Sequence, residues 1–249
     1  MLRWAEAHGR TRLQSWDAAT VRQFRQSWND GAIYATKNLE RLRAFFSFCI
    51  SQKWVKDNPA KEVKAAKVEP CPVLPFTDEQ MQKILEATDY YRGNKTRIKA
   101  FILAMRYSGL RISDTICLRR DALRHGKIWV RTEKTGVQVW VPVPPKVVEA
   151  LEALPVDGER FFWNGNGTLK TRVANWSRYL DSVFEHAGID GAHSHRFRHT
   201  FATSLLQKGT SVENVATLLG NSPKIVSKHY AAWIRERQEI LEREVMATW

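Results

Sequence analysis

The spacing of apolar residues along the chain predicts a mostly helical protein with one short β region. Residues 33–53 carry apolar side chains at intervals of three and four, which places them on one face of a long helix. Helical spacing also governs residues 77–118 and, further along, residues 146–245. Between these stretches, residues 127–132 and 137–143 alternate apolar and polar positions, as the strands of a β-hairpin do. The pattern therefore predicts a mainly α fold with a small antiparallel β-sheet.

Two capping signals indicate where helices begin. Asp17 precedes the apolar positions of residues 18–28, and a carboxylate there can accept a hydrogen bond from the first free amides of a helix. Thr77 is followed three residues later by Gln80, a pair that forms a capping box. We expect a helix to start directly after Asp17 and another directly after Thr77.

The composition of residues 61–75 indicates a linker between two domains. Asn58-Pro59 ends the first helical region, and three of the last six residues of the linker are prolines, which resist helix formation and favour an extended chain. We therefore expect a helical domain over residues 1–60 and a second, α+β domain over residues 76–249.

Charge changes this picture by pointing to a polyanionic partner. The chain holds 39 Lys and Arg against 26 Asp and Glu, a formal net charge of +13 with a pI near 9.9. Both sides of residue 75 carry the excess: 13 basic and 7 acidic side chains before the boundary, 26 and 19 after it. Such a field attracts nucleic acid, although a merely basic soluble enzyme stays open as an alternative.

Other features of the composition indicate a soluble intracellular protein. No apolar run reaches the roughly 18 residues that a membrane helix needs, and the start of the chain is too polar for a signal peptide. Cys49, Cys71 and Cys117 are odd in number and widely spaced, so they imply neither a disulfide framework nor a cysteine metal site. Free thiols suit a reducing cytoplasm.

Four places in the second domain carry side chains suited to phosphate chemistry. Arg111 follows a glycine turn and opens a short helix, where the helix start and the guanidinium both favour anions. Lys134 lies at the tip of the predicted hairpin. Residues 193–199 contain three histidines and two arginines. The fourth place is the turn after Leu218-Leu219, which contains Asn221 and is followed nine residues later by Tyr230. Each feature alone is more typical of an ordinary surface or core residue than of a functional one.

A zinc site is the competing interpretation of the histidines. His195 and His199 are four residues apart and could chelate one ion from a single helix face. No cysteine or acidic third ligand lies nearby, and no Glu follows His195 as a zinc protease requires. We therefore expect no metal and no cofactor.

Taken together, the four places resemble the tyrosine recombinases, also called the phage integrase family. The resemblance rests on GLRISD at 109–114, Lys134 eight residues before Pro142, HRFRHTFAT at 195–203, LLGNS at 218–222 and Tyr230. It covers residues 76–235. Residues 1–60 resemble the family's helical, SAM-like core-binding domain, including W-x-x-x-N-P-A at 54–60. The start is short for that domain, which is the pattern expected if its first helix is lacking.

The resemblance implies a site-specific recombinase that cleaves and rejoins DNA without metal or ATP. Tyr230 would attack the phosphorus and form a 3′-phosphotyrosyl bond. Arg111 and Arg198 would bind the phosphate oxygens where negative charge develops. Lys134, on its mobile hairpin, would protonate the leaving 5′ oxygen, and His195 would assist proton transfer.

Three further residues have supporting or altered roles in this resemblance. Asp114 would hold the Arg111 region in place, and His199 would be structural or supporting. Asn221 stands where the family usually has His or Trp; it can donate a hydrogen bond to a phosphate oxygen but cannot carry a proton. A reduced donor role is therefore expected at Asn221.

The resemblance also implies partners. Duplex DNA would be bound by both domains, with a contact surface on the long helix that includes Lys37, Arg41, Arg43 and Lys53. Four protomers would exchange strands through a Holliday junction, linked by a tail helix in residues 231–249 with apolar positions at Ile234, Leu241 and Val245. The protein would be nucleoid-associated in the cytoplasm and would need no membrane.

Three alternatives stay open at this point. A type IB topoisomerase would use a similar active site as a monomer to relax supercoils. A non-enzymatic or accessory-dependent DNA-binding protein of the same fold would bind DNA without forming a covalent adduct. A zinc hydrolase is the third and is the least consistent with the histidine spacing.

Overall fold

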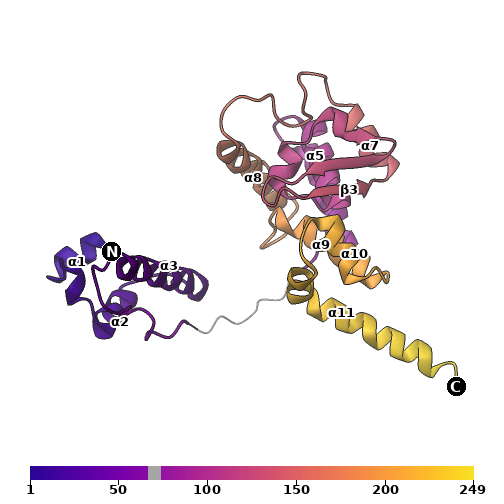
Figure 1. Cartoon of the computed structure of the whole chain (residues 1–249). Coiled ribbons are helices and arrows are strands. Elements are labelled where there is room, and N and C mark those ends of the chain that lie inside the picture. Colours follow the sequence, from indigo (N-terminus) through magenta and orange to yellow (C-terminus); the bar gives the residue numbers. More distant parts are fainter. Residues whose placement is uncertain (67–73) are drawn as a thin grey trace. The chain divides into compact units, whose positions relative to one another are not determined.

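The computed structural model describes residues 1–66 and 74–249, apart from the side chains of 231–240. Within this range the chain forms two compact units, Met1–Cys71 and Pro72–Trp249, each with its own hydrophobic core (Figure 1). Residues 67–73, which include two of the three prolines of the predicted linker, lie outside the described residues.

The first unit is helical. Its elements are α1 (Leu2–Ala7), a 3-10 turn η1 (Leu13–Ser15), α2 (Ala18–Gln26) and α3 (Ala32–Ser51). The predicted start of α2 is confirmed, because the Asp17 carboxylate accepts a hydrogen bond of 2.7 Å from the Thr20 amide. The apolar face of α3 forms the core of the unit, where Phe46 is completely buried and packs against Trp16.

Asn58 holds the segment after α3 against that helix. Its side-chain amide donates to the Arg43 carbonyl at 2.9 Å and to the Ser47 hydroxyl at 3.0 Å, while its carbonyl oxygen accepts from the Ala60 amide at 3.1 Å. Arg43 completes the connection by donating to the carbonyls of Ala60 and Val63. The N-P-A motif thus has a structural role, since the buried side chain of Asn58 makes three hydrogen bonds that hold this segment against α3.

The second unit contains a small sheet and most of the helices. The helices are α4 (Asp78–Ala87), α5 (Lys95–Ser108), α6 (Ile112–Ile116), α7 (Pro145–Glu152), α8 (Leu169–His186), α9 (His195–Gln207), α10 (Val212–Leu219) and α11 (Pro223–Met246), with 3-10 turns η2 (Thr88–Tyr90) and η3 (Arg120–Ala122). The Thr77–Gln80 capping box before α4 is present, as predicted. In the described residues no helix is both long and apolar enough to cross a membrane.

The sheet has three antiparallel strands in the order β1 (Leu123–Arg124), β2 (Lys127–Arg131) and β3 (Gln138–Pro142). The predicted β2–β3 hairpin is confirmed, with Trp129 opposite Trp140. Strand β1 was not predicted because two residues are too short to show an alternating pattern. The mainly α fold with a small antiparallel sheet is therefore confirmed.

Two apolar clusters give the second unit its internal arrangement. Helix α5 lies in the larger one, where the Phe101 ring stacks on Trp176 with centroids 3.9 Å apart. In the smaller cluster, Val139 and Val141 of β3 pack with residues of α9, α10 and α11, including Phe201 (Figure 1). This second cluster holds the sheet against α9, α10 and α11. Candidate site residues lie on the hairpin, on α9, just after α10 and on α11.

The beginning of the second unit is fastened to α9. The Phe76 amide donates to the Thr200 hydroxyl at 2.8 Å. The buried Arg196 guanidinium donates to the carbonyls of Leu74 and Pro75 and lies over the Phe76 ring. Arg196 therefore has a structural role, on the side of α9 that binds the incoming chain.

Candidate active site

Arg111 is positioned by a tight turn after α5. Gly109 ends that helix with φ +65°, and a side chain at this position would come within 2.4 Å of the Phe201 ring. Both the left-handed backbone and the close approach of Phe201 require glycine here. The turn delivers Arg111 to the N-cap of α6, next to the C-terminal end of α10.

Asn221 and Asp114 contact the Arg111 guanidinium. Arg111 Nη2 donates to Asn221 Oδ1 at 2.8 Å, and an arginine can only donate, so the amide oxygen of Asn221 must face it. Asp114, with a completely buried side chain, places Oδ2 at 3.8 Å from Arg111 Nη1. Neither Nη1 nor Oδ2 has a hydrogen-bond partner among the described residues. Asn221 thus keeps its amide hydrogens for another acceptor.

Arg198 is buried and joins two turns. Its guanidinium donates to the Gly109 carbonyl at 2.8 Å and to the Leu219 carbonyl at 2.6 Å. Burial and, to a lesser extent, the positive charge of Arg111 lower the pKa of Arg198 to about 10, while Tyr230 and Asp114 oppose the shift. At neutral pH the group remains charged, so two cationic guanidinium groups share this region.

Tyr230 lies at a break in α11. Its backbone torsions, φ −122° and ψ 19°, are not helical, although helix continues on both sides. The side chain is 3% exposed, and its hydroxyl lies 2.9 Å from Nδ1 of His199. Burial raises the pKa of Tyr230 to about 12, and burial likewise lowers the pKa of His199 to about 3. Tyr230 is therefore protonated and His199 neutral at pH 7.

His195 lies on the other side of His199 and is more exposed. The two rings meet edge to face with centroids 4.7 Å apart. Partial desolvation lowers the pKa of His195, and Arg198 and its neighbours lower it further. Of the two histidines, the one that reaches the Tyr230 hydroxyl is His199.

The hairpin that carries Lys134 is fastened on both sides of that residue. The Glu133 amide donates to Asp114 Oδ1 at 2.8 Å, and the Thr135 hydroxyl donates to the Gly220 carbonyl at 3.4 Å. Lys134 lies between them in the turn, exposed, and its ammonium group makes no hydrogen bond or ion pair within the described part of the chain.

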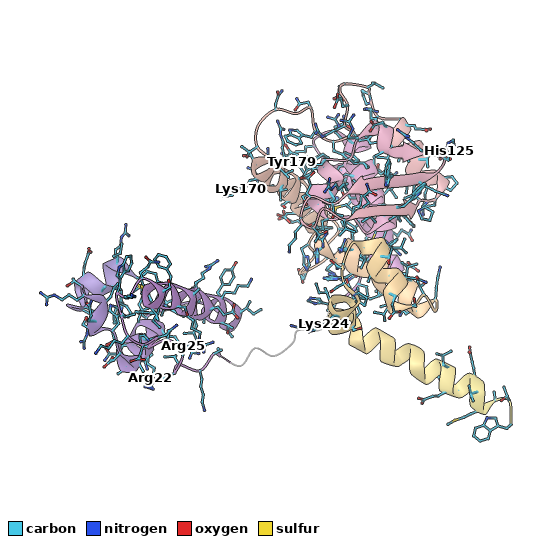
Figure 2. The ribbon with its side chains drawn as sticks, viewed as in Figure 1. Arg22, Arg25, His125, Lys170, Tyr179 and Lys224 are labelled. Atoms are coloured by element: carbon cyan, nitrogen blue, oxygen red, sulfur yellow. The ribbon has the colours of Figure 1, made fainter. Side chains whose placement is uncertain are left out.

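The four predicted DNA-contacting residues of the first unit differ in availability. Lys37, Arg41 and Lys53 are exposed, whereas the Arg43 guanidinium is already hydrogen-bonded to main-chain carbonyls. Exposed basic side chains also occur elsewhere on both units: Figure 2 labels Arg22 on the first and Lys170 and Lys224 on the second.

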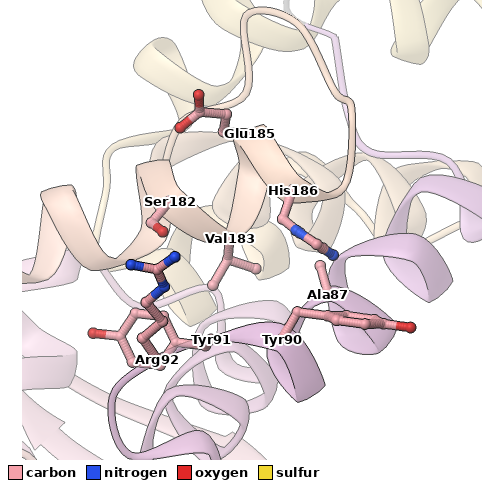
Figure 3. A pocket seen from close by; sticks show the side chains of 8 residues that line it. All are labelled: Ala87, Tyr90, Tyr91, Arg92, Ser182, Val183, Glu185 and His186. Atoms are coloured by element: carbon pink, nitrogen blue, oxygen red, sulfur yellow. The ribbon is translucent and has the colours of Figure 1, made fainter.

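No metal site is evident in the described region, since no three His, Cys, Asp or Glu side chains there are grouped to hold an ion. A separate hollow of about 470 Å³ lies between α8 and the end of α4 (Figure 3). Tyr90 and His186 stack at its edge with ring centroids 4.4 Å apart, and none of the candidate site residues lines it.

Arg111, His195, Arg198 and Tyr230 all lie within a region of the chain that matches a known family profile. Residues 75–236, about two thirds of the chain, match the profile of the phage integrase family. The chain belongs to the phage integrase family.

Curated relatives of this integrase-family chain are tyrosine recombinases. It is 26% identical over 258 residues to a tyrosine recombinase XerD of Ralstonia nicotianae, covering 97% of this chain and 82% of the relative. It is 29% identical over 226 residues to a tyrosine recombinase XerC of Shigella flexneri, covering 84% and 75%.

Solved structures of integrase-family proteins share the fold. A XerH site-specific recombinase in a post-cleavage complex with a palindromic difH substrate superposes with a TM-score of 0.72 at 19% identity, covering 92% of this chain and 72% of that one. A lambda integrase dimer bound to a COC' core site gives 0.70 at 19% identity, covering 86% and 82%, and a lambda integrase tetramer bound to a Holliday junction gives 0.69 at 19% identity, covering 84% and 65%.

Sequence reasoning missed three contacts of this integrase site. The fastening of the hairpin by Asp114 and by Thr135, and the contact of His199 with Tyr230, join residues 19 to 85 positions apart. No local pattern connects residues so distant. The position of His199, one residue after Arg198, did indicate that it lies near the site, but not that it contacts Tyr230.

Proposed function

We propose that this chain is a site-specific DNA recombinase that cleaves one strand at a time through Tyr230. The Tyr230 oxygen would attack the scissile phosphorus, forming a 3′-phosphotyrosyl bond and releasing a 5′ hydroxyl. Attack by a 5′ hydroxyl from another strand would reverse the step, so rejoining needs no ATP.

The observation that carries the proposal is the convergence of Arg111, Arg198 and Tyr230 from three separate elements of the second unit. Arg198 lies close enough to Arg111 and Tyr230 for both to influence its pKa, and Arg111 Nη1 is a buried donor that lacks an acceptor among the described residues. A phosphate oxygen would supply that acceptor. Guanidinium donors stabilise the charge that develops on a phosphoryl group in the transition state.

Lys134 and Asn221 would complete the site. The exposed lysine has a free ammonium to protonate the leaving 5′ oxygen, while the Asn221 amide can donate to a phosphate oxygen after its carbonyl has oriented Arg111. His195, beside both arginines, would assist proton transfer on the phosphate side of the site. Asp114 would serve as the support that Arg111 and the hairpin share.

The proposal extends to DNA and to assembly. In this proposal the helical domain of residues 1–60 would bind the duplex with Lys37, Arg41 and Lys53, and residues 76–249 would carry the chemistry. A tetramer on a Holliday junction, as in the lambda integrase structure, would require a contact between protomers. The tail of α11 is our candidate, with exposed Leu241 and Val245; the side chain of Ile234 lies outside the described ones.

Covalent capture tests the proposal. The full chain is incubated with nicked fragments of its flanking and genomic DNA, denatured, and examined for protein–DNA adducts beside Tyr230→Phe. An adduct in the wild type alone, sequenced to locate the cleaved phosphate, is the expected result. DNA binding with no adduct would instead support a non-enzymatic protein of this fold.

A further inference from the structure

The Tyr230 hydroxyl is in contact with a histidine that the proposed chemistry has not yet used. His199 Nδ1 lies 2.9 Å from the hydroxyl oxygen, and the two rings are inclined at 66° with centroids 5.7 Å apart. Both residues lie on helices of the smaller apolar cluster, α9 and α11, which pack against each other. The contact is therefore held by the fold and not by a loop.

Burial determines the direction of this hydrogen bond. A buried hydroxyl group needs an acceptor for its hydrogen, and no other acceptor lies within hydrogen-bond distance of Tyr230 among the described side chains. A neutral histidine offers a lone pair on Nδ1 when Nε2 carries the proton. The tyrosine is thus the donor and the Nδ1 atom of His199 is the acceptor.

We propose that His199 is the base that removes the proton from Tyr230 during strand cleavage; this rests on the proposed recombinase function. As the bond from Tyr230 Oη to phosphorus forms and the bond from phosphorus to the 5′ oxygen breaks, the hydroxyl proton moves to His199 Nδ1. The leaving 5′ oxygen takes a separate proton from Lys134. On rejoining, a 5′ hydroxyl attacks the phosphorus and gives its proton to Lys134 as the phosphotyrosyl bond breaks, and His199 returns its proton to Tyr230.

The environment of His199 explains why it would accept the Tyr230 proton only when DNA is bound. Burial disfavours a positive charge on the His199 ring, and the neighbouring His195, His193, His229 and Arg198 disfavour it further. A bound phosphodiester brings a negative charge to Arg111 and Arg198 and offsets that field. The base is then competent only when the substrate phosphate is present, and the two histidines have separate tasks, His195 beside the phosphate and His199 beside the nucleophile.

A leaving-group substitution separates this role from that of Lys134. The probe is a nicked duplex with the sequence recovered by covalent capture, made with either a normal phosphodiester or a 5′-bridging phosphorothiolate, whose sulfur leaves without being protonated. Single-turnover cleavage is measured for the full-length wild type, His199→Gln, His199→Leu, Lys134→Ala and, as a matched histidine control, His186→Gln at the edge of the separate hollow in Figure 3.

Both His199 variants should cleave about 10²–10⁴-fold more slowly on both probes, a typical range for loss of a general base. The phosphorothiolate should restore Lys134→Ala and leave the His199 defects unchanged, while His186→Gln should match the wild type. Glutamine can accept the tyrosine hydrogen bond but cannot take its proton, so wild-type cleavage by His199→Gln would overturn the proposal. Rescue of either His199 variant by the phosphorothiolate would overturn it as well.

A second measurement needs no folded variant. Nitrogen NMR of the histidine rings should show His199 Nδ1 without a proton in free wild-type protein and with one in the phosphotyrosyl adduct. A protonated Nδ1 in the free protein would overturn the inference. Absence of any wild-type adduct would count against the recombinase function itself, so the two failures are distinguishable.

Discussion

The inner half of the site, formed by Arg198, His199 and Tyr230, and its outer half, formed by Lys134 and His195, differ in how their polar groups are satisfied. The inner groups are buried or half-buried, and each has a protein partner: two carbonyls for Arg198, and one another for His199 and Tyr230. The outer two are exposed. The difference shows that folding alone satisfies the polar groups of the inner half, whereas the outer half would take its partners from DNA under the proposed function.

Replacement of Arg198 by Ala should have the largest effect and should damage both stability and cleavage. The Gly109 and Leu219 carbonyls would each lose a donor, at about 1–3 kcal/mol for each buried acceptor left unpaired. Cleavage should fall by about 10²–10³-fold or more, as for loss of one transition-state donor. Urea unfolding and single-turnover cleavage measure the two effects, and unchanged stability would contradict the distinction between the halves.

Replacement of Lys134 by Ala should separate activity from stability. Because the side chain is exposed and its ammonium makes no hydrogen bond or ion pair within the described residues, the free energy of unfolding should stay within about 0.5 kcal/mol of the wild type. Cleavage should nevertheless fall about 10²-fold or more, since the leaving oxygen loses its acid. The same two measurements test this; a clear loss of stability would place Lys134 with the inner half.

Acidification should weaken the fold through His199 of the inner half. Burial lowers the pKa of His199 from 6.5 to about 3, so the unfolded chain takes up a proton near pH 6.5 that the folded chain binds only near pH 3. The resulting stability is fully present above pH 6.5 and is lost as the pH falls toward 3, and His195, whose pKa burial lowers to about 4, adds to the decline over the same range. Urea unfolding between pH 7.5 and 5 should show the decline, and His199→Gln should make it shallower. If the free energy of unfolding of His199→Gln fell equally steeply with pH, other titrating groups would be responsible for the decline.

Asn221→His should have the smallest effect. Histidine can accept from Arg111 through one ring nitrogen and donate to a phosphate oxygen through the other, so the two tasks of Asn221 are kept. Cleavage should be unchanged or raised in the single-turnover assay. A large loss would mean that the shape of the amide, and not its hydrogen bonding, positions Arg111.

Sequence patterns predicted the elements better than the contacts between them. The caps at Asp17 and Thr77 and the β2–β3 hairpin follow from local chemistry and were found where expected. The break of α11 at Tyr230 was not predicted, because its flanks are equally helical in pattern.

The candidate site was predictable as a set of residues from their spacing, but not as a network. Arg43 looked like a free cation on the exposed side of α3, yet Ala60 and Val63 fold back onto it. Asp114 was expected to support Arg111, whereas its second task at Glu133 depends on a strand pairing that only the folded sheet reveals. Such roles arise from tertiary contacts and leave no local trace.

The fastening of Glu133 and Thr135 has a consequence for how this protein selects its substrate. Because both neighbours of Lys134 are hydrogen-bonded to the rest of the unit, the reach of its ammonium group is set by the length of its own side chain, which has four methylene groups. A leaving oxygen must be brought inside that small radius by the DNA itself. Under the proposed mechanism, a distorted or misregistered duplex would bind and yet remain uncut, because its leaving oxygen would lie outside that radius.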